Sequence, residues 1–213
     1  MPGISVAVKV HPDNSFCDFY GDTVVFDLEE EDKTWLAALV QKLYDEVPAC
    51  FAESFPVSSY HMTLYDLSSG SRLSSLMPEL KSNRQKLKQQ LAVRSLFSPK
   101  IKMRSSFIFN MVDTSLVMGL VPDREVDYVN LMSLYRLVDG VMPLPYPFTP
   151  HVTLAYYNAN GFSAEEARKL KKLVAELNKC SVTVPWILVS SIIKLLRVRK
   201  IIRTFLLYLR SKR

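Results

Sequence analysis

The stretch "YHMTLYDL" (residues 60–67) recurs ninety residues later as "PHVTLAYY" (residues 150–157), and this repetition organises the chain. Each string holds a histidine followed two positions later by a threonine: His61 and Thr63, then His151 and Thr153. Side chains two apart on a strand point to the same face, about 7 Å apart. We therefore expect each histidine to share a strand face with its threonine, while the intervening apolar residues pack on the other face.

The elements predicted around the two strings follow the same order twice. The first half reads as a strand (23–28), a helix from Asp32, the His61 strand, one or two helices (72–97) and a strand ending in a hairpin at "NMVD". The second half reads as a strand ("TSLVMGLV"), a helix between Pro122 and Gly140, the His151 strand after a proline-rich loop, a helix capped by Ser163 and Glu166, and the strand "SVTVPWILVS".

The spacings of the two halves agree. A helix begins 29 residues before His61 and another 28 residues before His151. Such self-similarity indicates an internal duplication. We expect an α+β fold that is a bilobal, pseudo-two-fold duplication, in which each lobe is an antiparallel sheet with helices packed outside and an active groove lies between the lobes.

Two such histidine–threonine pairs suit the chemistry of a phosphodiester. Histidine titrates near neutral pH, so one imidazole can accept a proton while an imidazolium donates one to a leaving oxygen. Threonine hydroxyls can donate hydrogen bonds to phosphate oxygens as charge develops. This scheme needs no metal or cofactor, and a metal site is disfavoured because there is no H-E-x-x-H string and no carboxylate partner can be placed for His11.

The amino-acid composition limits the cellular compartment and the binding partners that can be expected. With 213 residues and 48% hydrophobic content, the chain can bury a core. Three widely spaced cysteines, with no C-x-x-C pair, and an N-terminus unlike a secretory signal favour a reducing, cytoplasmic setting. Eight of the 27 basic residues lie in residues 191–213, which leaves 19 basic against 21 acidic groups elsewhere. The rest of the chain is therefore not a basic nucleic-acid surface on average.

The C-terminal stretch combines these positive charges with apolar residues at helical spacing. Between residues 192 and 209, six apolar side chains fall on one helical stripe: Leu195, Val198, Ile202, Phe205, Leu206 and Leu209. We expect a basic amphipathic tail over residues 191–213 that either docks on the body or contacts an anionic membrane or RNA. It carries too many charges to span a bilayer.

The strings "HMTL" and "PHVTLAY" resemble the two signature motifs of the two-histidine (2H) phosphoesterase superfamily, which includes RNA ligase-like 2′,5′-phosphodiesterases and 2′,3′-cyclic nucleotide phosphodiesterases. The resemblance covers roughly residues 18–190, and "FYGDTVVFDL" is also similar to a less characterised branch. It implies that His61 and His151 are the catalytic acid and base, and that Thr63 and Thr153 bind phosphate.

Other residues are candidates for contacts with a nucleotide. Four aromatic residues can stack on a base: Tyr65, Tyr146, Phe148 and Tyr157. Some members of the superfamily carry a basic phosphate-binding residue after the second motif, where this chain has Ala155 and Tyr156. Arg104 or Lys102 are the residues that can take its place.

The sequence thus predicts a metal-independent phosphodiesterase that acts on 2′,3′-cyclic phosphates or 2′,5′-linkages of nucleotides or RNA ends. The expected domain limits are an N-terminal segment (1–17), a phosphoesterase-like domain (18–190, with intertwined lobes 18–110 and 111–190) and the tail (191–213). We expect a monomer. A non-catalytic nucleotide- or RNA-binding module, or a peripheral membrane adaptor anchored by the tail, remain alternatives, and the two histidines are not distinguished as acid and base.

Overall fold

The computed structural model describes residues 4–92, 101–180, 185–197 and 203–205. Its elements follow in the order η1 (Ile4–Val8), β1 (Tyr20–Leu28), α1 (Glu30–Glu46), η2 (Pro48–Cys50), η3 (Val57–Ser59), β2 (His61–Gly70), α2 (Leu73–Ala92), β3 (Ile101–Met111), β4 (Ser115–Pro122), α3 (Glu125–Asp139), β5 (His151–Tyr156), α4 (Ala164–Cys180), β6 (Pro185–Arg197) and β7 (Arg203–Phe205). The predicted order of strand, helix, histidine strand, helix and strand is therefore confirmed in both halves.

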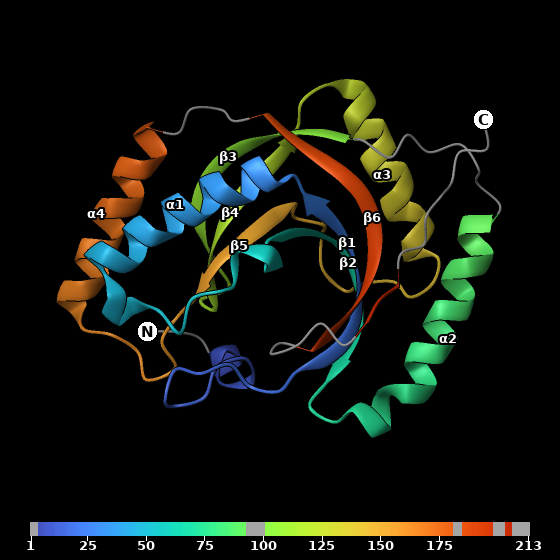
Figure 1. The fold of residues 1–213 in the computed structure, drawn as a ribbon, viewed down its shortest axis with the longest axis horizontal. Helices are drawn as coiled ribbons and strands as arrows, with labels where there is room; N and C mark the ends of the chain where they lie inside the picture. The colour runs from blue at the N-terminus through green and yellow to red at the C-terminus, as the bar shows by residue number, and fades with distance from the viewer. Residues whose placement is uncertain (1–3, 93–100, 181–184, 198–202, 206–213) are drawn as a thin grey trace.

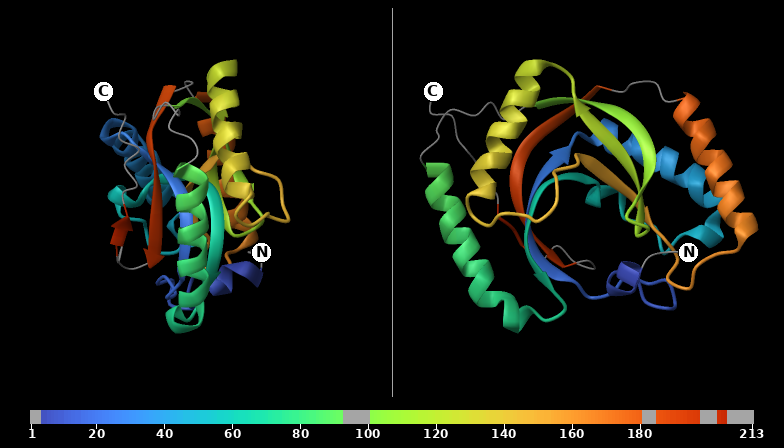
Figure 2. Two further views of the ribbon diagram at one scale, coloured as in Figure 1. Left: turned by 90° about the vertical axis from the view of Figure 1, so that its right-hand side faces the viewer. Right: turned by 180° about the vertical axis from the view of Figure 1, so that it is seen from behind.

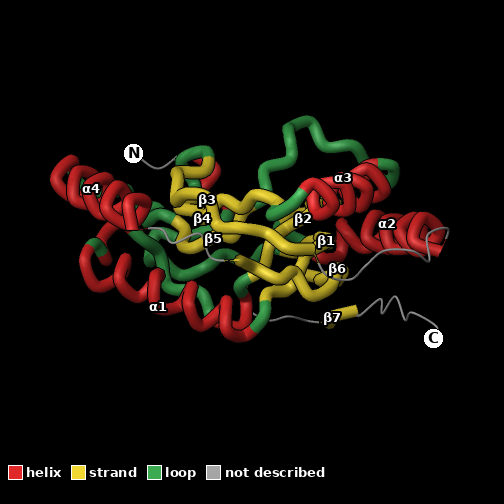
Figure 3. The backbone as a smooth tube through the Cα atoms, turned by 90° about the horizontal axis from the view of Figure 1, so that it is seen from above, coloured by secondary structure: helices red, strands yellow, loops and turns green. Residues whose placement is uncertain are grey.

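The strands form one antiparallel sheet that closes on itself. The sheet order is β1-β2-β5-β4-β3-β6-β7, and β6 also pairs with β1, so six strands make a ring (Figure 1). Helices lie outside the strands, with α1 and α4 toward one end and α2 and α3 toward the other (Figures 2 and 3). The α+β class and the antiparallel strands are confirmed, but the expected sheets of the two lobes are joined into a single sheet.

The pairing pattern maps onto itself when the two halves are exchanged. Replacing β1, β2 and β3 by β4, β5 and β6 converts the β1–β2 pairing into β4–β5 and the β3–β4 pairing into β6–β1. The β2–β5 and β3–β6 pairings convert into themselves. A two-fold relation between the halves would produce this pattern, and the duplication itself stays a prediction.

Local sequence explains where the helices begin. Acidic residues fill the first turn of α1, where the helix dipole favours negative charge, and Leu36, Val40 and Leu43 form its buried stripe. At the start of α4, the backbone N–H of Glu166 donates to the Ser163 hydroxyl over 3.1 Å, as the predicted cap requires. Pro122 does not begin α3 as expected, because it is the last residue of β4.

The helical stretch after β2 is one continuous helix over its described residues, Leu73–Ala92. The polar segment "KSNRQK" raised the alternative of two helices, but buried Asn83 has polar partners on the sheet. Its side-chain amide donates to the Ser68 hydroxyl over 2.8 Å and to the Asp22 carboxylate over 3.3 Å. A buried polar group that finds such partners need not interrupt the helix.

The end of the described chain differs from the expected amphipathic helix. Residues 192–197 continue β6 and pair with β1, from Val25↔Ile192 to Tyr20↔Arg197, and residues 203–205 form β7. A short apolar run does not distinguish helix from strand by periodicity, and here the β-branched residues of "SSII" meet an edge of β1 that offers backbone hydrogen bonds. The strand therefore crosses the expected boundary at residue 191. The remaining tail, residues 198–202 and 206–213, lies outside the described residues.

The N-terminal segment is part of the same folded unit. Residues Val6, Val10 and Phe16 are at most 5% exposed and belong to the main hydrophobic core. Within the described ranges, none of the helices combines the length and apolar composition needed to cross a bilayer.

Candidate active site

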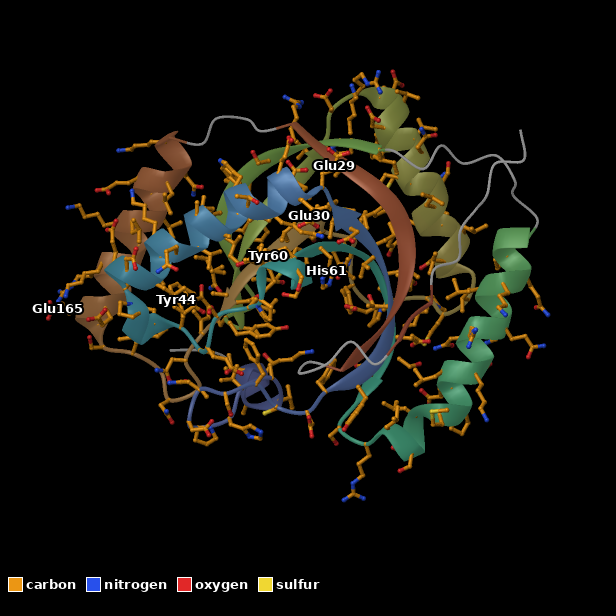
Figure 4. All side chains as sticks on the ribbon, viewed as in Figure 1. Glu29, Glu30, Tyr44, Tyr60, His61 and Glu165 are labelled. Carbon is orange, nitrogen blue, oxygen red and sulfur yellow. The ribbon has the colours of Figure 1, made fainter. Side chains whose placement is uncertain are left out.

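The two histidine strands are neighbours in the sheet. Strands β2 and β5 run antiparallel and pair through Met62↔Val152, both fully buried. The histidines and threonines that flank these two residues are partly exposed: His61, Thr63, His151 and Thr153. The alternation from His61 to Thr63 and from His151 to Thr153 is that expected from the sequence, and His61 lies within the ring of strands (Figure 4).

The pairing register sets how the four side chains are arranged. Continuing the Met62↔Val152 register by one residue places His61 opposite Thr153 and Thr63 opposite His151. Residues directly opposite on an antiparallel pair have Cβ atoms about 5 Å apart, and diagonal neighbours are about 7–8 Å apart. The four residues therefore form a quartet with the histidines on one diagonal, a spacing that can accommodate one phosphate group between them.

Both imidazoles are held in the same way. The Nδ1 atom of His61 lies 2.6 Å from the carbonyl oxygen of Ser59, and that of His151 lies 2.6 Å from the carbonyl oxygen of Thr149. A carbonyl can only accept a hydrogen bond, so Nδ1 carries the proton in each neutral ring. In both rings Nε2 is then the nitrogen that can take up a proton.

A β-bulge follows the threonine of β2. Val25 is opposite Thr63 but the preceding Val24 is opposite Tyr65, so Leu64 is an extra residue in β2. Such a bulge reverses the alternation of faces beyond it. Tyr65 consequently leaves the face of His61 and Thr63, and Asp66 takes its place on that face.

The expected stacking role of Tyr65 is therefore wrong. Its side chain is 1% exposed, and its hydroxyl lies 2.6 Å from both the Asp139 carboxylate and the Met142 carbonyl oxygen. Burial, reinforced by the charge of Asp139, raises the pKa of Tyr65. The phenol hydroxyl therefore links β2 to the end of α3 through its hydrogen bond to Asp139.

The same bulge occurs in β5. Val117 is opposite Thr153 while Leu116 is opposite Ala155, so Tyr156 rather than Ala155 shares the face of Thr153. The Tyr156 ring packs edge-on against Phe55, with centroids 5.2 Å apart, and burial raises its pKa to about 12. Tyr156 therefore borders the quartet, a position that the strict period-two pattern did not give it.

Of the other three aromatic candidates, Tyr146 alone is well exposed, at 51%. Phe148 is partly buried and stacks on Tyr135 with centroids 4.7 Å apart, and Tyr157 is buried against Phe51. Burial and, secondarily, the charge of Asp66 raise the pKa of Tyr146. Tyr157 thus lies in the core and Phe148 packs against it, which leaves Tyr146 as a candidate for contact with a ligand.

Two aromatic residues that the sequence analysis did not single out lie beside His151. Its cross-strand partner is Gly119, where a Cβ atom would come within 3.1 Å of the Phe109 ring. The Phe109 ring is 5.2 Å from that of Phe107, which is 54% exposed. Phe109 pairs with Val117, so it lies on the face of the quartet. Because Gly119 has no side chain, the Phe109 ring can pack directly against its backbone.

The two basic residues expected to bind phosphate, Arg104 and Lys102, lie on β3. Arg104 forms an ion pair with Asp123, with Nε and Oδ1 3.1 Å apart. Lys9 of the N-terminal segment is a further basic residue, and its Nζ lies 3.2 Å from the centre of the Phe19 ring. Burial lowers the pKa of Lys9 to about 8, although the charge of nearby Asp66 acts in the opposite direction. Sequence reasoning missed Lys9 because residues 1–17 were set apart from the domain.

A charged cluster lies at the other end of the quartet, beside His61. The cross-strand partner of His61 is Asp27. The amine of buried Lys33 lies 3.2 Å from the Asp27 carboxylate and 2.8 Å from that of Glu30. Burial alone would lower the pKa of Lys33, but the two carboxylates outweigh it and the pKa is raised. The strand end "FDLEEEDK" contains this cluster, although only the pairing register reveals that it adjoins His61.

Among the residues that the structure describes, no three His, Cys, Asp or Glu side chains come together as a metal site would require. The quartet itself offers two imidazoles and two hydroxyls.

The fold is thus an α+β fold whose antiparallel strands close into a ring, with two histidine–threonine pairs on adjoining strands. No protein-family model and no curated protein sequence matches the chain. The crystal structure of the conserved protein of unknown function ATU0111 from Agrobacterium tumefaciens str. C58 is similar over 94% of each chain, at 18% identity and a TM-score of 0.62. This likeness shows a shared fold.

Two further solved structures overlap with a smaller part of the chain. E. coli LigT complexed with phosphate matches 69% of this chain and 76% of its own, at 14% identity and a TM-score of 0.45. TT0787 of Thermus thermophilus matches 67% of this chain and 77% of its own, at 18% identity and a TM-score of 0.46.

Proposed function

We propose that the protein is a metal-independent phosphodiesterase of the 2H type, which hydrolyses 2′,3′-cyclic phosphate or 2′,5′-phosphodiester bonds of nucleotides or RNA ends. The observation that carries the proposal is the equivalent anchoring of His61 and His151, each with Nδ1 2.6 Å from the carbonyl oxygen two residues earlier. This arrangement presents two Nε2 atoms for proton transfer. The paired halves of the sheet, which would arise from a duplication, support the same proposal.

In the proposed reaction, one neutral imidazole takes a proton from the attacking water as its oxygen bonds to phosphorus. The other, as imidazolium, gives a proton to the leaving oxygen as the P–O bond breaks. The hydroxyls of Thr63 and Thr153 donate hydrogen bonds to the non-bridging oxygens, where negative charge increases. After one turnover the two histidines have exchanged protonation states, so a proton must return through solvent before the next.

Hydrolysis of 2′,3′-cyclic nucleotides and of a 2′,5′-linked dinucleotide in excess EDTA tests the proposal. We expect the wild type to turn over at least one of them, and His61→Ala and His151→Ala each to lower kcat about 10²- to 10⁴-fold. His11→Ala is the matched control, because His11 is exposed and lies in the turn before Ser15. Absence of turnover, or turnover unchanged in either variant, would overturn the proposal and favour a nucleotide-binding module.

The setting and the partners follow from the proposal and from the cysteines. Cys17 and Cys50 are free thiols in the described part of the chain, which suits the cytoplasmic location that we propose. The substrate that we propose is a nucleotide or an RNA end. We also propose a monomer. The contact with an anionic membrane or RNA expected of residues 192–213 rested on a helix, and that argument fails for residues 192–197 because they form part of β6.

A further inference from the structure

Asp66 is the next residue after Thr63 on the face of the quartet. The bulge in β2 sets these two residues three apart in sequence, so about 7–10 Å separates them along the strand. The Asp66 side chain is exposed. The hydroxyl of buried Thr23 lies 3.2 Å from Asp66 Oδ1 and 3.0 Å from the Tyr65 carbonyl oxygen, and its one proton is shared between them. Most of the accepting capacity of the carboxylate is therefore available to a ligand.

Lys9 places a cation near this carboxylate. Its backbone belongs to a hairpin, in which the N–H of Cys17 donates to the Lys9 carbonyl oxygen over 2.9 Å. The amine lies 3.2 Å from the centre of the Phe19 ring. Burial lowers the pKa of Lys9 to about 8, and the charge of Asp66 is close enough to oppose this shift. Among the residues that the structure describes, the amine forms no ion pair, so a ligand that presents a hydrogen-bond acceptor would replace the water it has lost.

The hairpin is also held against the second histidine strand. The Phe16 ring lies edge-on to the Tyr156 ring, with centroids 6.0 Å apart. Beyond β5, the side-chain amide of Asn160 donates to the Pro12 carbonyl oxygen over 2.7 Å. These contacts fix the backbone that carries Lys9.

Two phenols border the same carboxylate. Burial raises the pKa values of Tyr146 and Tyr156, and in both cases the charge of Asp66 raises the pKa further. Tyr146 comes from the proline-rich loop before β5 and is 51% exposed, while Tyr156 lies beside Thr153 on the quartet face. Aromatic rings in such a position can stack on a nucleobase whose polar edge meets charged groups. Asp66 thus has an ammonium group and two aromatic rings as its neighbours.

The Watson–Crick edges of the four bases differ in what they offer such a site. Guanine presents two adjacent donors, N1–H and N2–H, which match the two oxygens of a carboxylate, and beside them the acceptor O6, which suits an ammonium. Adenine and cytosine present a single donor group, and uracil presents one N–H between two carbonyl oxygens. Guanine is therefore the base whose edge satisfies both oxygens of Asp66 and the amine of Lys9 at the same time.

We propose that Asp66 and Lys9 select guanine as the base of the nucleotide: the Asp66 carboxylate accepts hydrogen bonds from N1–H and N2–H, and the Lys9 ammonium donates one to O6. The inference rests on the proposed function, and it names a nucleotide or RNA end that carries guanine as the preferred substrate. A ribose then spans the distance between the phosphate at Thr63 and the base at Asp66.

Binding of mononucleotides tests this selection without turnover, because they hold no phosphodiester bond. Guanosine 3′-monophosphate and inosine 3′-monophosphate differ only in the N2 amino group, so titration calorimetry with the two isolates the contact with Asp66. We expect wild type to bind the guanosine nucleotide about 10- to 10²-fold more tightly, because a hydrogen bond to a charged acceptor is lost with the amino group. Asp66→Asn should abolish this ratio, and the matched control Asp45→Asn, at an exposed position of α1, should keep it.

Lys9→Met separates the two contacts. Guanine and hypoxanthine both carry O6, so this variant should weaken both nucleotides by roughly 10-fold and leave their ratio unchanged. Adenosine 3′-monophosphate, which lacks O6, should be weakened less. An equal loss for all three would mean that Lys9 binds the phosphate and would overturn its assignment. Equal binding of guanosine and inosine nucleotides by wild type, a ratio that survives in Asp66→Asn, or no binding of the guanosine nucleotide would overturn the inference.

Rates on 2′,3′-cyclic nucleotides distinguish failure of this inference from failure of the proposed function. We expect kcat/KM to be highest for the guanosine substrate, and to exceed that of the inosine substrate by about the same 10- to 10²-fold as in binding. Equal kcat/KM for all bases would leave hydrolysis standing and refute the selection. Binding with the expected ratio but without hydrolysis would refute the proposed function and support the selection of guanine.

Discussion

We expect Lys9 to make the protein less stable at neutral pH than a neutral side chain of the same length would. Its amine lies 3.2 Å from the centre of the Phe19 ring. Burial lowers its pKa from 10.5 to about 8, against the opposing charge of Asp66. A lysine whose pKa falls on folding is less stable as a cation in the folded state than in the unfolded state. We therefore predict that Lys9→Met stabilises the fold at pH 7.

The magnitude follows from the shift of the pKa. Each pKa unit corresponds to about 1.4 kcal/mol, so the shift from 10.5 to about 8 sets an upper bound of about 3.4 kcal/mol. The substitution also removes the contact between the ammonium and the ring, worth about 0.5–1 kcal/mol, and the side chain is partly exposed to solvent, which weakens the effect. We expect Lys9→Met to raise the free energy of unfolding by about 1–2 kcal/mol.

Urea unfolding of wild type and Lys9→Met between pH 7 and pH 11 is the assay. Because the pKa of Lys9 is lower in the folded state, that state binds fewer protons between about pH 8 and pH 10.5, and wild-type stability rises relative to the variant in this window. The difference between the two proteins should be full below pH 8 and should vanish above pH 10.5.

The control is Lys171→Met, since Lys171 is exposed on α4, and its effect should stay within about 0.5 kcal/mol at every pH. A variant Lys9→Met that is less stable than wild type at pH 7 would mean that the ring contact outweighs the burial. A stability difference that does not change between pH 8 and pH 10.5 would refute the titration argument.

Three further substitutions probe the proposed phosphate contacts and the fold. Thr63→Val and Thr153→Val keep side-chain shape but remove a hydroxyl donor, and each should lower kcat about 10- to 10²-fold with unchanged unfolding curves; equal activity would exclude the proposed phosphate contact. Asp127→Ala should cost about 1–3 kcal/mol at pH 7, because buried Asp127 accepts hydrogen bonds from Arg124 and from the backbone of Lys102. Burial alone would raise the pKa of Asp127, but these hydrogen bonds outweigh burial and lower the pKa. The stabilisation by Asp127 is therefore present above about pH 4 and is lost as the pH falls through its pKa in the folded state. Urea unfolding should show that Asp127→Ala costs less stability at pH 3 than at pH 7.

The arrangement of elements could be predicted because it depends on local patterns. Strand alternation around His61 and His151 and helical spacing elsewhere are properties of neighbouring residues, and the structure has the same order of strands and helices. Even the cap at Ser163 is a contact between residues three apart. Local signals of this kind do not depend on which strands pair.

Features that depend on pairing could not be predicted. The bulges after Thr63 and Thr153 are visible only in the register with β1 and β4, and they moved Tyr65 into the core. Residues 192–197 form a strand because β1 offers them backbone hydrogen-bond partners. The sequence of residues 192–197 does not show that they will pair with β1. Asn83 likewise keeps α2 continuous through contacts with Asp22 and Ser68, far from it in sequence.

The two halves share a backbone plan, but the chemistry around the quartet is one-sided. Charged residues adjoin the strand of His61, whereas glycine and aromatic rings adjoin that of His151. The charged group consists of Asp27, Lys33, Asp66 and Lys9, and the uncharged group of Gly119, Phe109, Phe107 and Tyr156. A symmetric site would hold a phosphodiester equally well in two orientations and would give neither histidine a fixed role. Since a nucleotide has an aromatic base at one end and polar hydroxyls and phosphate at the other, such a one-sided site would favour a single orientation of the substrate that we propose.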